Sequence, residues 1–202
     1  MLSLIIGTTN EAKIKQIMGA LAPLRIPIQG IADKNKLPEI RENGTTAQEN
    51  ARKKAIAYAK AFGQTVLSMD NALYFEGLST EQQPGIAVRR IPGSSGRPSD
   101  EQLLNYYSDL IKKLGARVHG HWEFAICVAD PKGHARETSI ISPRIFTSLP
   151  SPKFIPGYPL ESLQIDPESN RYISEMSQQE QDLFWQRTTG KELCEFVKSI
   201  DL

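Results

Sequence analysis

The chain has 202 residues, enough for one well-buried domain or for two small lobes, and length alone does not separate these. Its 40% hydrophobic and 23% charged residues are those of an ordinary soluble globular protein. With 24 basic and 23 acidic residues the formal charge is +1, which argues against a nucleic-acid partner, and no apolar stretch reaches membrane-spanning length. Cys127 and Cys194 match no metal spacing, so we expect reduced core residues in a cytoplasmic protein.

The opening strand breaks at Gly7 into the polar run from Thr8 to Lys13, and a helical apolar pattern follows until Pro23. Hydroxyl, amide and ammonium groups before a helix N-terminus are where proteins commonly bind phosphate. The same groups are ordinary helix caps, and this stretch alone favours the cap. A loose alternation from Ile26 to Ile31 predicts a second strand.

Thr46 begins the clearest predicted helix, which ends before Gly63. Thr46 and Glu49 have the spacing of a capping box. Asn50 and Lys54 lie one turn apart on a face other than the apolar one, which is typical of a solvated stripe.

A strand over Thr65–Met69 is predicted to end at Asp70 and Asn71. An acid at the carboxyl end of a strand lies where ligand crevices form in α/β proteins, although an Asx turn explains the same residues equally well. The stretch from Gln83 to Arg90 predicts a Pro-Gly turn followed by another strand.

In the second half, Ser99 and Gln102 form a capping box before a structural helix, and two alternating runs around Asp130–Gly133 predict a hairpin. His119 and His121 point to one side of a strand but have no third ligand nearby. Gly157 and Tyr158 lie in a proline-rich loop, where a tyrosine can stack on a planar ligand or simply pack. Arg187 precedes the final helix and is either a phosphate or base contact or a surface arginine.

The order of these segments along nearly the whole chain resembles the inosine triphosphate pyrophosphatase family, which acts on non-canonical purine nucleoside triphosphates. The matching stretches are Thr8–Lys13, Glu42–Thr45 with Glu49–Ala51 and Lys54-Ala55, Leu67–Leu73, Pro84-Gly85 with Val88-Arg89, and Gly157-Tyr158. The block from Glu42 to Ala55 is the most specific of them.

The resemblance implies an α/β fold, an elongated mixed sheet flanked by helices, forming one domain over residues 1–202 with two lobes and a nucleotide cleft between them. It implies hydrolysis of a nucleoside triphosphate to the monophosphate and pyrophosphate with Mg²⁺ or Mn²⁺, and it suggests a homodimer. Carried over by position, the phosphate-binding residues are Thr8, Thr9, Asn10, Lys13, Lys54 and Arg187; the nucleotide contacts are Asn71, Gly157 and Tyr158; Asp70 is catalytic; Glu42 and Asp70 are the metal ligands.

The chain also departs from the family pattern. Met69 replaces the first of two aspartates, Pro159 replaces the aspartate after Gly-Tyr, Gln181 replaces a lysine, and Trp185-Gln186 replaces the Ser-His of a Ser-His-Arg motif. Most of these lost groups belong to the base-recognition side, whereas the phosphate side is retained. We therefore expect nucleoside triphosphate binding with altered base selectivity.

Two alternatives remain beside a metal-dependent pyrophosphatase. The loss at Met69 is compatible with a catalytically weak nucleotide-binding or regulatory protein of the same fold. A related pyrophosphatase acting on modified pyrimidine nucleotides is the other. A nucleic-acid-binding module is the least favoured, because the chain has no basic stripe with interleaved aromatic residues.

Overall fold

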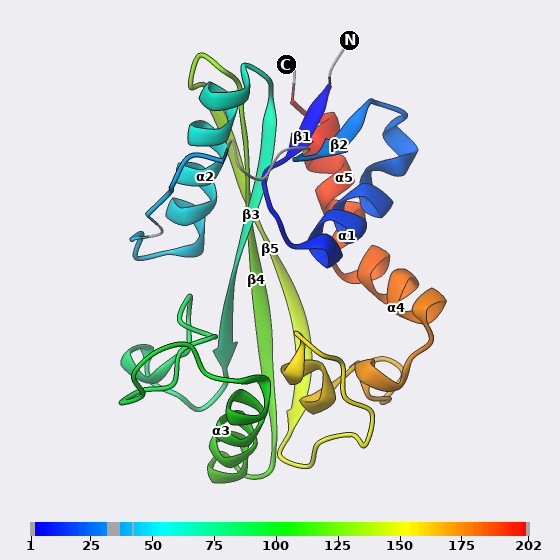
Figure 1. Cartoon of the computed structure of the whole chain (residues 1–202). Helices are drawn as coiled ribbons and strands as arrows, with labels where there is room; N and C mark the ends of the chain where they lie inside the picture. Colours follow the sequence, from blue (N-terminus) through cyan, green and yellow to red (C-terminus); the bar gives the residue numbers. More distant parts are fainter. Residues whose placement is uncertain (1–2, 32–36, 42, 201–202) are drawn as a thin grey trace. The chain divides into compact units, whose positions relative to one another are not determined.

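The computed structural model of the protein describes residues 3–31, 37–41 and 43–200 (Figure 1). It has a six-stranded mixed sheet with the strand order β2-β1-β3-β4-β5-β6, together with helices, so the expected α/β class is confirmed. The chain divides into two compact units: Met1–Asn71, Glu123–Ile141 and Asp182–Leu202 form unit 1, and Ala72–Trp122 and Ser142–Gln181 form unit 2. Within the described residues, no helix is both long and apolar enough to cross a membrane.

Unit 1 contains parallel strands joined by helices, together with part of the β4–β5 hairpin described below. Strand β1 pairs in parallel with β2 and with β3, as expected for strands connected through crossover helices. In Figure 1, α2 covers one side of these strands, and α1 and α5 lie together on the other. Its elements are β1 (Leu4–Ile6), α1 (Glu11–Leu21), η1 (Ala22–Leu24), β2 (Ile28–Gly30), α2 (Ala47–Phe62), η6 (Gln186–Gly190) and α5 (Lys191–Lys198).

Three long strands contribute residues to both units. Strand β3 covers Val66–Phe75, and β4 (Arg117–Ala129) and β5 (Ala135–Thr147) form the predicted hairpin. The prediction that the first of these strands ends at Asp70 and Asn71 is wrong, because β3 continues for four further residues. Its continuation buries Ala72, Leu73 and Phe75, and this burial favours extending the strand over an Asx turn.

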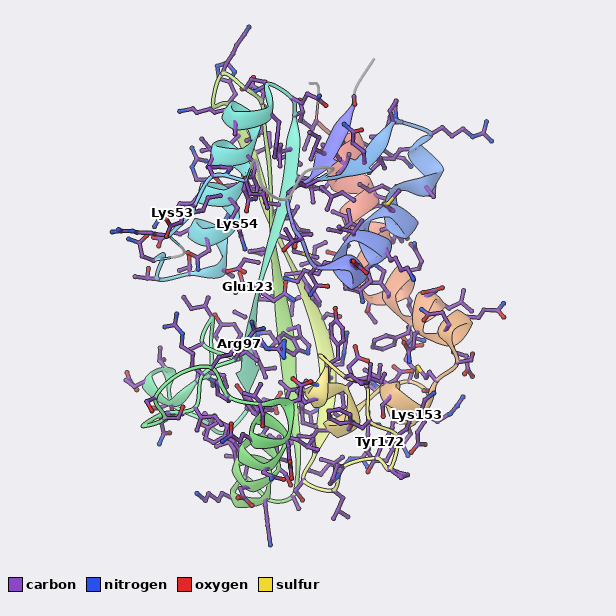
Figure 2. The ribbon with its side chains drawn as sticks, viewed as in Figure 1. Lys53, Lys54, Arg97, Glu123, Lys153 and Tyr172 are labelled. Atoms are coloured by element: carbon purple, nitrogen blue, oxygen red, sulfur yellow. The ribbon has the colours of Figure 1, made fainter. Side chains whose placement is uncertain are left out.

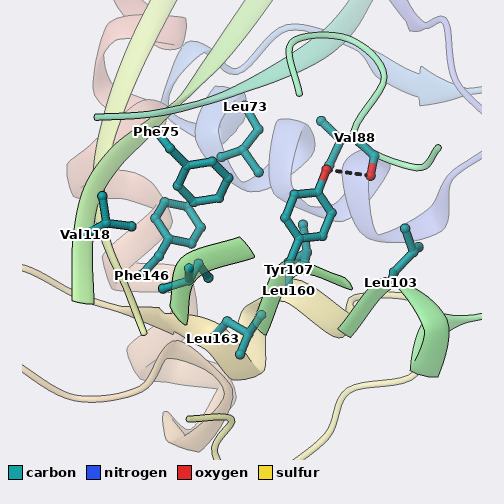
Figure 3. Packing of buried hydrophobic residues seen from close by; sticks show 10 residues of the cluster. Leu73, Phe75, Val88, Leu103, Tyr107, Val118, Phe146, Leu160 and Leu163 are labelled. Atoms are coloured by element: carbon teal, nitrogen blue, oxygen red, sulfur yellow. Dashed lines mark hydrogen bonds between the residues drawn. The ribbon is translucent and has the colours of Figure 1, made fainter. Parts of the chain in front are cut away.

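Unit 2 has an apolar core of its own, seen in Figure 3. Phe75 packs edge-on against Phe146 with ring centroids 4.7 Å apart, and Tyr107 lies 6.1 Å from Phe75. The Tyr107 hydroxyl donates to the Val88 carbonyl oxygen at 2.9 Å, so this buried polar group is satisfied. The remaining elements are η3 (Thr80–Gln82), α3 (Asp100–Lys113), η4 (Pro159–Leu163), β6 (Gln164–Ile165), η5 (Ile173–Glu175) and α4 (Gln178–Trp185), the last shared with unit 1.

The predicted strand within Gln83–Arg90 is absent, and turns occupy this described segment. Only a single bridge joins Gly85 to Leu73 there. The side chain of Gln83 takes the place of strand pairing, since its amide accepts from the Phe75 N–H and donates to the Phe75 carbonyl oxygen, both at 2.8 Å. Turn bonds from Ala87 to Pro84 and from Arg90 to Ala87 then curl the chain away.

Candidate functional site

The loop after β1 is tied closely to β3. The Gly7 N–H donates to the Leu67 carbonyl oxygen at 2.7 Å, and the buried Ser68 hydroxyl donates to the Gly7 carbonyl oxygen at 3.3 Å. A Cβ atom on Gly7 would collide with Ser68 Oγ and lie 2.7 Å from Val66 Cγ1, so any other residue at this position would force these side chains to move. The sequence did not identify Ser68 as a supporting residue of this loop.

Beyond Gly7 the loop caps α1. The Thr8 hydroxyl accepts from the Asn10 N–H at 3.2 Å, and Asn10 Oδ1 accepts from the Lys13 N–H at 3.2 Å. The capping role expected for Asn10 is therefore present. Thr9 and Asn10 are exposed at the start of α1, where the helix dipole favours an anion.

Two ammonium groups reach neighbouring residues in the middle of β3. Lys13 Nζ from α1 donates to Asn71 Oδ1 at 3.2 Å, and Lys54 Nζ from α2 lies 3.1 Å from Asp70 Oδ1. Successive side chains of a strand point to opposite faces, so each helix supplies one lysine to its own face of β3. The structure thus brings together four of the predicted site residues.

Lys54 is not part of a solvated stripe. Only 9% of Lys54 and 3% of Asn50 are exposed, and both belong to the buried residues of α2. A lysine buried to this extent needs a partner for its charge, and Asp70 supplies one. Figure 2 shows Lys54 beside its neighbour Lys53, which is exposed and donates instead to Asn43 Oδ1 at 2.8 Å.

The first turn of α2 holds the preceding loop. The Thr46 hydroxyl accepts from the Glu49 N–H at 3.1 Å, as the capping box predicts, but the Glu49 carboxylate reaches the N–H of Thr45 at 2.7 Å. Bonds from the Thr45 backbone and hydroxyl lower the pKa of Glu49. Buried Asn50 accepts from the Gly44 N–H at 2.8 Å, so the whole turn is fixed by α2 side chains.

The predicted metal ligands are only partly described. Glu42 lies outside the described residues, and no group of three or more His, Cys, Asp or Glu side chains elsewhere in the described chain is arranged to hold a metal. Asp70 is the one predicted metal ligand that can be examined. Its carboxylate fits a magnesium ion held mainly by substrate phosphates and water, because Mg²⁺ commonly takes only one or two protein carboxylates.

Arg187 lies on an unusual helical segment. It belongs to η6, a π-helical turn between α4 and α5, and such turns are frequent at functional sites. Its guanidinium carbon stands 5.6 Å from the Phe184 ring centroid, in cation–π geometry, and the residue is exposed. Trp185 anchors this segment in unit 1 by donating from Nε1 to the Gln16 carbonyl oxygen at 3.1 Å.

Gly157 and Tyr158 belong to unit 2, whereas the other described site residues belong to unit 1. Gly157 has φ +82°, a conformation that favours glycine, and its peptide group is held by Arg89 and Asp100. Tyr158 donates its N–H to the Ile155 carbonyl oxygen at 3.0 Å and precedes η4. The hydrogen-bonding role of Asp100 was not recognised from the sequence.

Four of the residues that depart from the family pattern have structural roles: Met69, Pro159, Gln181 and Trp185. Met69 is buried, and Pro159 is buried at the start of η4. Gln181 donates from Nε2 to the carbonyl oxygens of Ile173 and Met176, both at 3.2 Å. Trp185 packs edge-on against Phe124 with ring centroids 5.2 Å apart.

Comparison with known proteins gives one consistent result. A model of the Ham1 family matches residues 4–190. A dITP/XTP pyrophosphatase of Exiguobacterium is 31% identical over 182 residues, covering 89% of this chain and 88% of that protein.

Two solved structures share the fold. A HAM1 protein from Coxiella burnetii has a TM-score of 0.77 at 19% identity and covers 99% of this chain and 100% of its own. The Staphylococcus aureus Ham1 protein has a TM-score of 0.73 at 22% identity and covers 97% of this chain and 98% of its own.

Proposed function

The chain belongs to the Ham1 family, and we propose that it is a nucleoside triphosphate pyrophosphatase that releases a nucleoside monophosphate and pyrophosphate. The observation that carries this proposal is the pair of lysines that contact β3 from two helices: Lys13 of α1 beside Asn71, and Lys54 of α2 beside Asp70. Membership of the Ham1 family confirms the resemblance to the inosine triphosphate pyrophosphatases, and the Exiguobacterium relative is named a dITP/XTP pyrophosphatase.

In this proposal the phosphates are bound in unit 1. Thr8, Thr9 and Asn10 present polar groups at the N-terminus of α1, and Lys13, Lys54 and Arg187 add positive charge. Ammonium groups at fixed positions stabilise the charge that develops on a departing pyrophosphate. The contact of Lys13 with Asn71 and that of Lys54 with Asp70 hold both lysines in place before substrate binds.

Asp70 would hold a divalent cation together with the substrate phosphates, and Glu42 is proposed as a further ligand. A bound Mg²⁺ or Mn²⁺ lowers the pKa of water and neutralises phosphate charge. Lys54 orients the Asp70 carboxylate, because its ammonium nitrogen lies 3.1 Å from Asp70 Oδ1.

We propose that base selectivity differs from that of an inosine- or xanthine-specific enzyme. Pro159, Gln181 and Trp185 support backbone and aromatic packing, so these side chains are committed to the fold. Gly157 and Tyr158 with Asn71 remain as the proposed nucleotide contacts. A tyrosine that stacks on a base is tolerant of base identity, because every base offers a flat face.

A nucleotide panel tests this selectivity. Pyrophosphate release would be measured with Mg²⁺ and ITP, XTP, dITP, GTP, ATP and dUTP. We expect activity on several purine nucleotides without a large preference for ITP or XTP. Hydrolysis of ITP far faster than every other nucleotide would contradict altered selectivity, and a preference for dUTP would favour the pyrimidine-directed alternative.

A catalytically weak nucleotide-binding protein is the second candidate, and buried Met69 in place of an acid favours it. Binding of ITP without pyrophosphate release would support this candidate. We also propose that the protein is a homodimer and is cytoplasmic; free, buried Cys127 and Cys194 agree with a reducing compartment. Light scattering of the purified chain tests the dimer.

A further inference from the structure

Three segments of unit 2 meet at the Gly157 peptide. Arg89 donates from Nη1 and Nη2 to the Gly157 carbonyl oxygen at 3.2 and 3.3 Å, and Asp100 Oδ2 accepts from the Gly157 N–H at 2.6 Å. Arg89 Nη2 also donates to Asp100 Oδ1 at 3.0 Å. These contacts close a ring, which we call the Gly157 clasp: Arg89, Asp100 and Gly157.

The clasp holds both polar groups of one peptide at once. Gly157 lies in an irregular, exposed loop with φ +82°, so sheet or helix pairing does not hold its position. Charge-assisted hydrogen bonds are roughly twice as strong as neutral ones, and here they act as a closed network. The exposed fractions of the Arg89 and Asp100 side chains are 44% and 30%, so water weakens each hydrogen bond. Each of the three residues nevertheless contacts the other two, so the contacts together hold the position of the Gly157 peptide.

Asp100 is well placed to act as the fixed member of the clasp. It is the first residue of α3, a helix capped by Ser99 and Gln102, and the pKa of its carboxyl is lowered by the Gly157 N–H and by the Arg89 and Arg97 guanidinium groups, in spite of partial burial. The carboxylate therefore stays ionised around neutral pH. Figure 2 labels Arg97 in the loop that precedes this helix.

We propose that Asp100, acting through Arg89 and Gly157, is a positioning residue for the nucleotide contact of Tyr158. This inference rests on the proposed function and deepens it. Tyr158 follows the clasp directly, and its carbonyl oxygen accepts from the Glu161 N–H at 3.1 Å, so the tyrosine lies between a fixed peptide and the start of η4. The contact between Tyr158 and the base then depends on the Asp100 carboxylate, which does not itself contact the base.

Asp100→Asn tests the proposal, with Glu101→Gln as its matched control. Both variants remove one negative charge from the first turn of α3, but only Asp100 contacts the loop. An asparagine amide has one acceptor oxygen, so it cannot accept from both Gly157 and Arg89 in the same geometry. We expect the KM for a hydrolysed nucleotide to rise about tenfold in Asp100→Asn, kcat to change little, and the inhibition constant of pyrophosphate to stay unchanged. Glu101→Gln should move none of these.

Hydrogen–deuterium exchange of the peptide that contains Gly157 gives a readout independent of catalysis. Exchange should be faster in Asp100→Asn than in Glu101→Gln. Arg89→Ala should also speed exchange, and the double variant with Arg89→Ala and Asp100→Asn should exchange no faster than either single variant. Equal exchange in the two single-charge variants would overturn the clasp. An active wild type with equal KM values in both would overturn the positioning role alone, whereas a wild type that releases pyrophosphate from no nucleotide would overturn the proposed function.

Discussion

Lys54 and Asp70 form a largely buried ion pair, with Nζ 3.1 Å from Oδ1 and side-chain exposed fractions of 11% and 17%. A pair taken out of water to this extent is weak evidence for stability, because desolvation offsets much of the attraction. The pair places an ammonium and a carboxylate at the same point of β3, where the proposed chemistry requires both.

Removal of the Lys54 charge therefore tests the function of the pair. We predict that Lys54→Met lowers kcat/KM for nucleotide hydrolysis by at least about a hundredfold, because a charge that offsets developing phosphate charge is lost. Lys53→Met is the control, since Lys53 is exposed on the same helix. Steady-state pyrophosphate release measures both variants, and equal activity would contradict a role for Lys54.

Space around Gly7 gives a second prediction. In Gly7→Ala the new methyl group meets Ser68 Oγ and Val66 Cγ1, so we expect a loss of about 1–3 kcal/mol in the free energy of unfolding. Gly19→Ala in α1 meets no heavy atom closer than 3.9 Å and should stabilise the protein by up to about 1 kcal/mol, as alanine favours helix. Urea denaturation measures both; a Gly7→Ala protein as stable as the wild type would refute the close packing around Gly7.

Glu161 predicts a pH dependence of stability. Burial raises the pKa of Glu161 to about 7, although the Arg144 guanidinium opposes the shift. The ordinary pKa is 4.5, so between about pH 4.5 and 7 the folded protein keeps a proton that the unfolded chain has released. Stability should therefore fall as the pH rises through this window, by up to about 3 kcal/mol.

Glu161→Gln should remove this part of the pH dependence, because glutamine does not titrate. Urea denaturation at pH 5 and pH 7.5 would compare it with the wild type and with Glu76→Gln, an exposed control in the same unit. The same decrease in stability in all three proteins would show that Glu161 does not cause it.

Local sequence was sufficient to predict the elements with strong end signals. The capped helix from Thr46, the capping box of Ser99 and the hairpin around Asp130–Gly133 are all present. In each, hydrogen bonds between residues three or four apart or a short turn fix the structure. Such signals are readable without knowledge of the rest of the fold.

Contacts between segments far apart in the sequence explain why some sequence-based predictions were wrong or incomplete. Asp70 and Asn71 resemble a turn locally, but pairing and burial further along extend β3 through them. Lys54 has charged neighbours in sequence, yet it is buried and pairs with Asp70 of β3, 16 residues away. Asp100 and Gly157 are 57 residues apart, so no local pattern shows their bond.

We propose that Asp70 takes part in hydrolysis between the α and β phosphates, and product analysis of ITP incubated with Mg²⁺ tests this role most directly. Phosphorus NMR of the wild-type reaction should show IMP and pyrophosphate, and Asp70→Asn, which keeps the size of the side chain but removes its charge, should form neither at a measurable rate. Equal pyrophosphate formation by the two proteins, or release of inorganic phosphate and IDP by the wild type, would contradict the account.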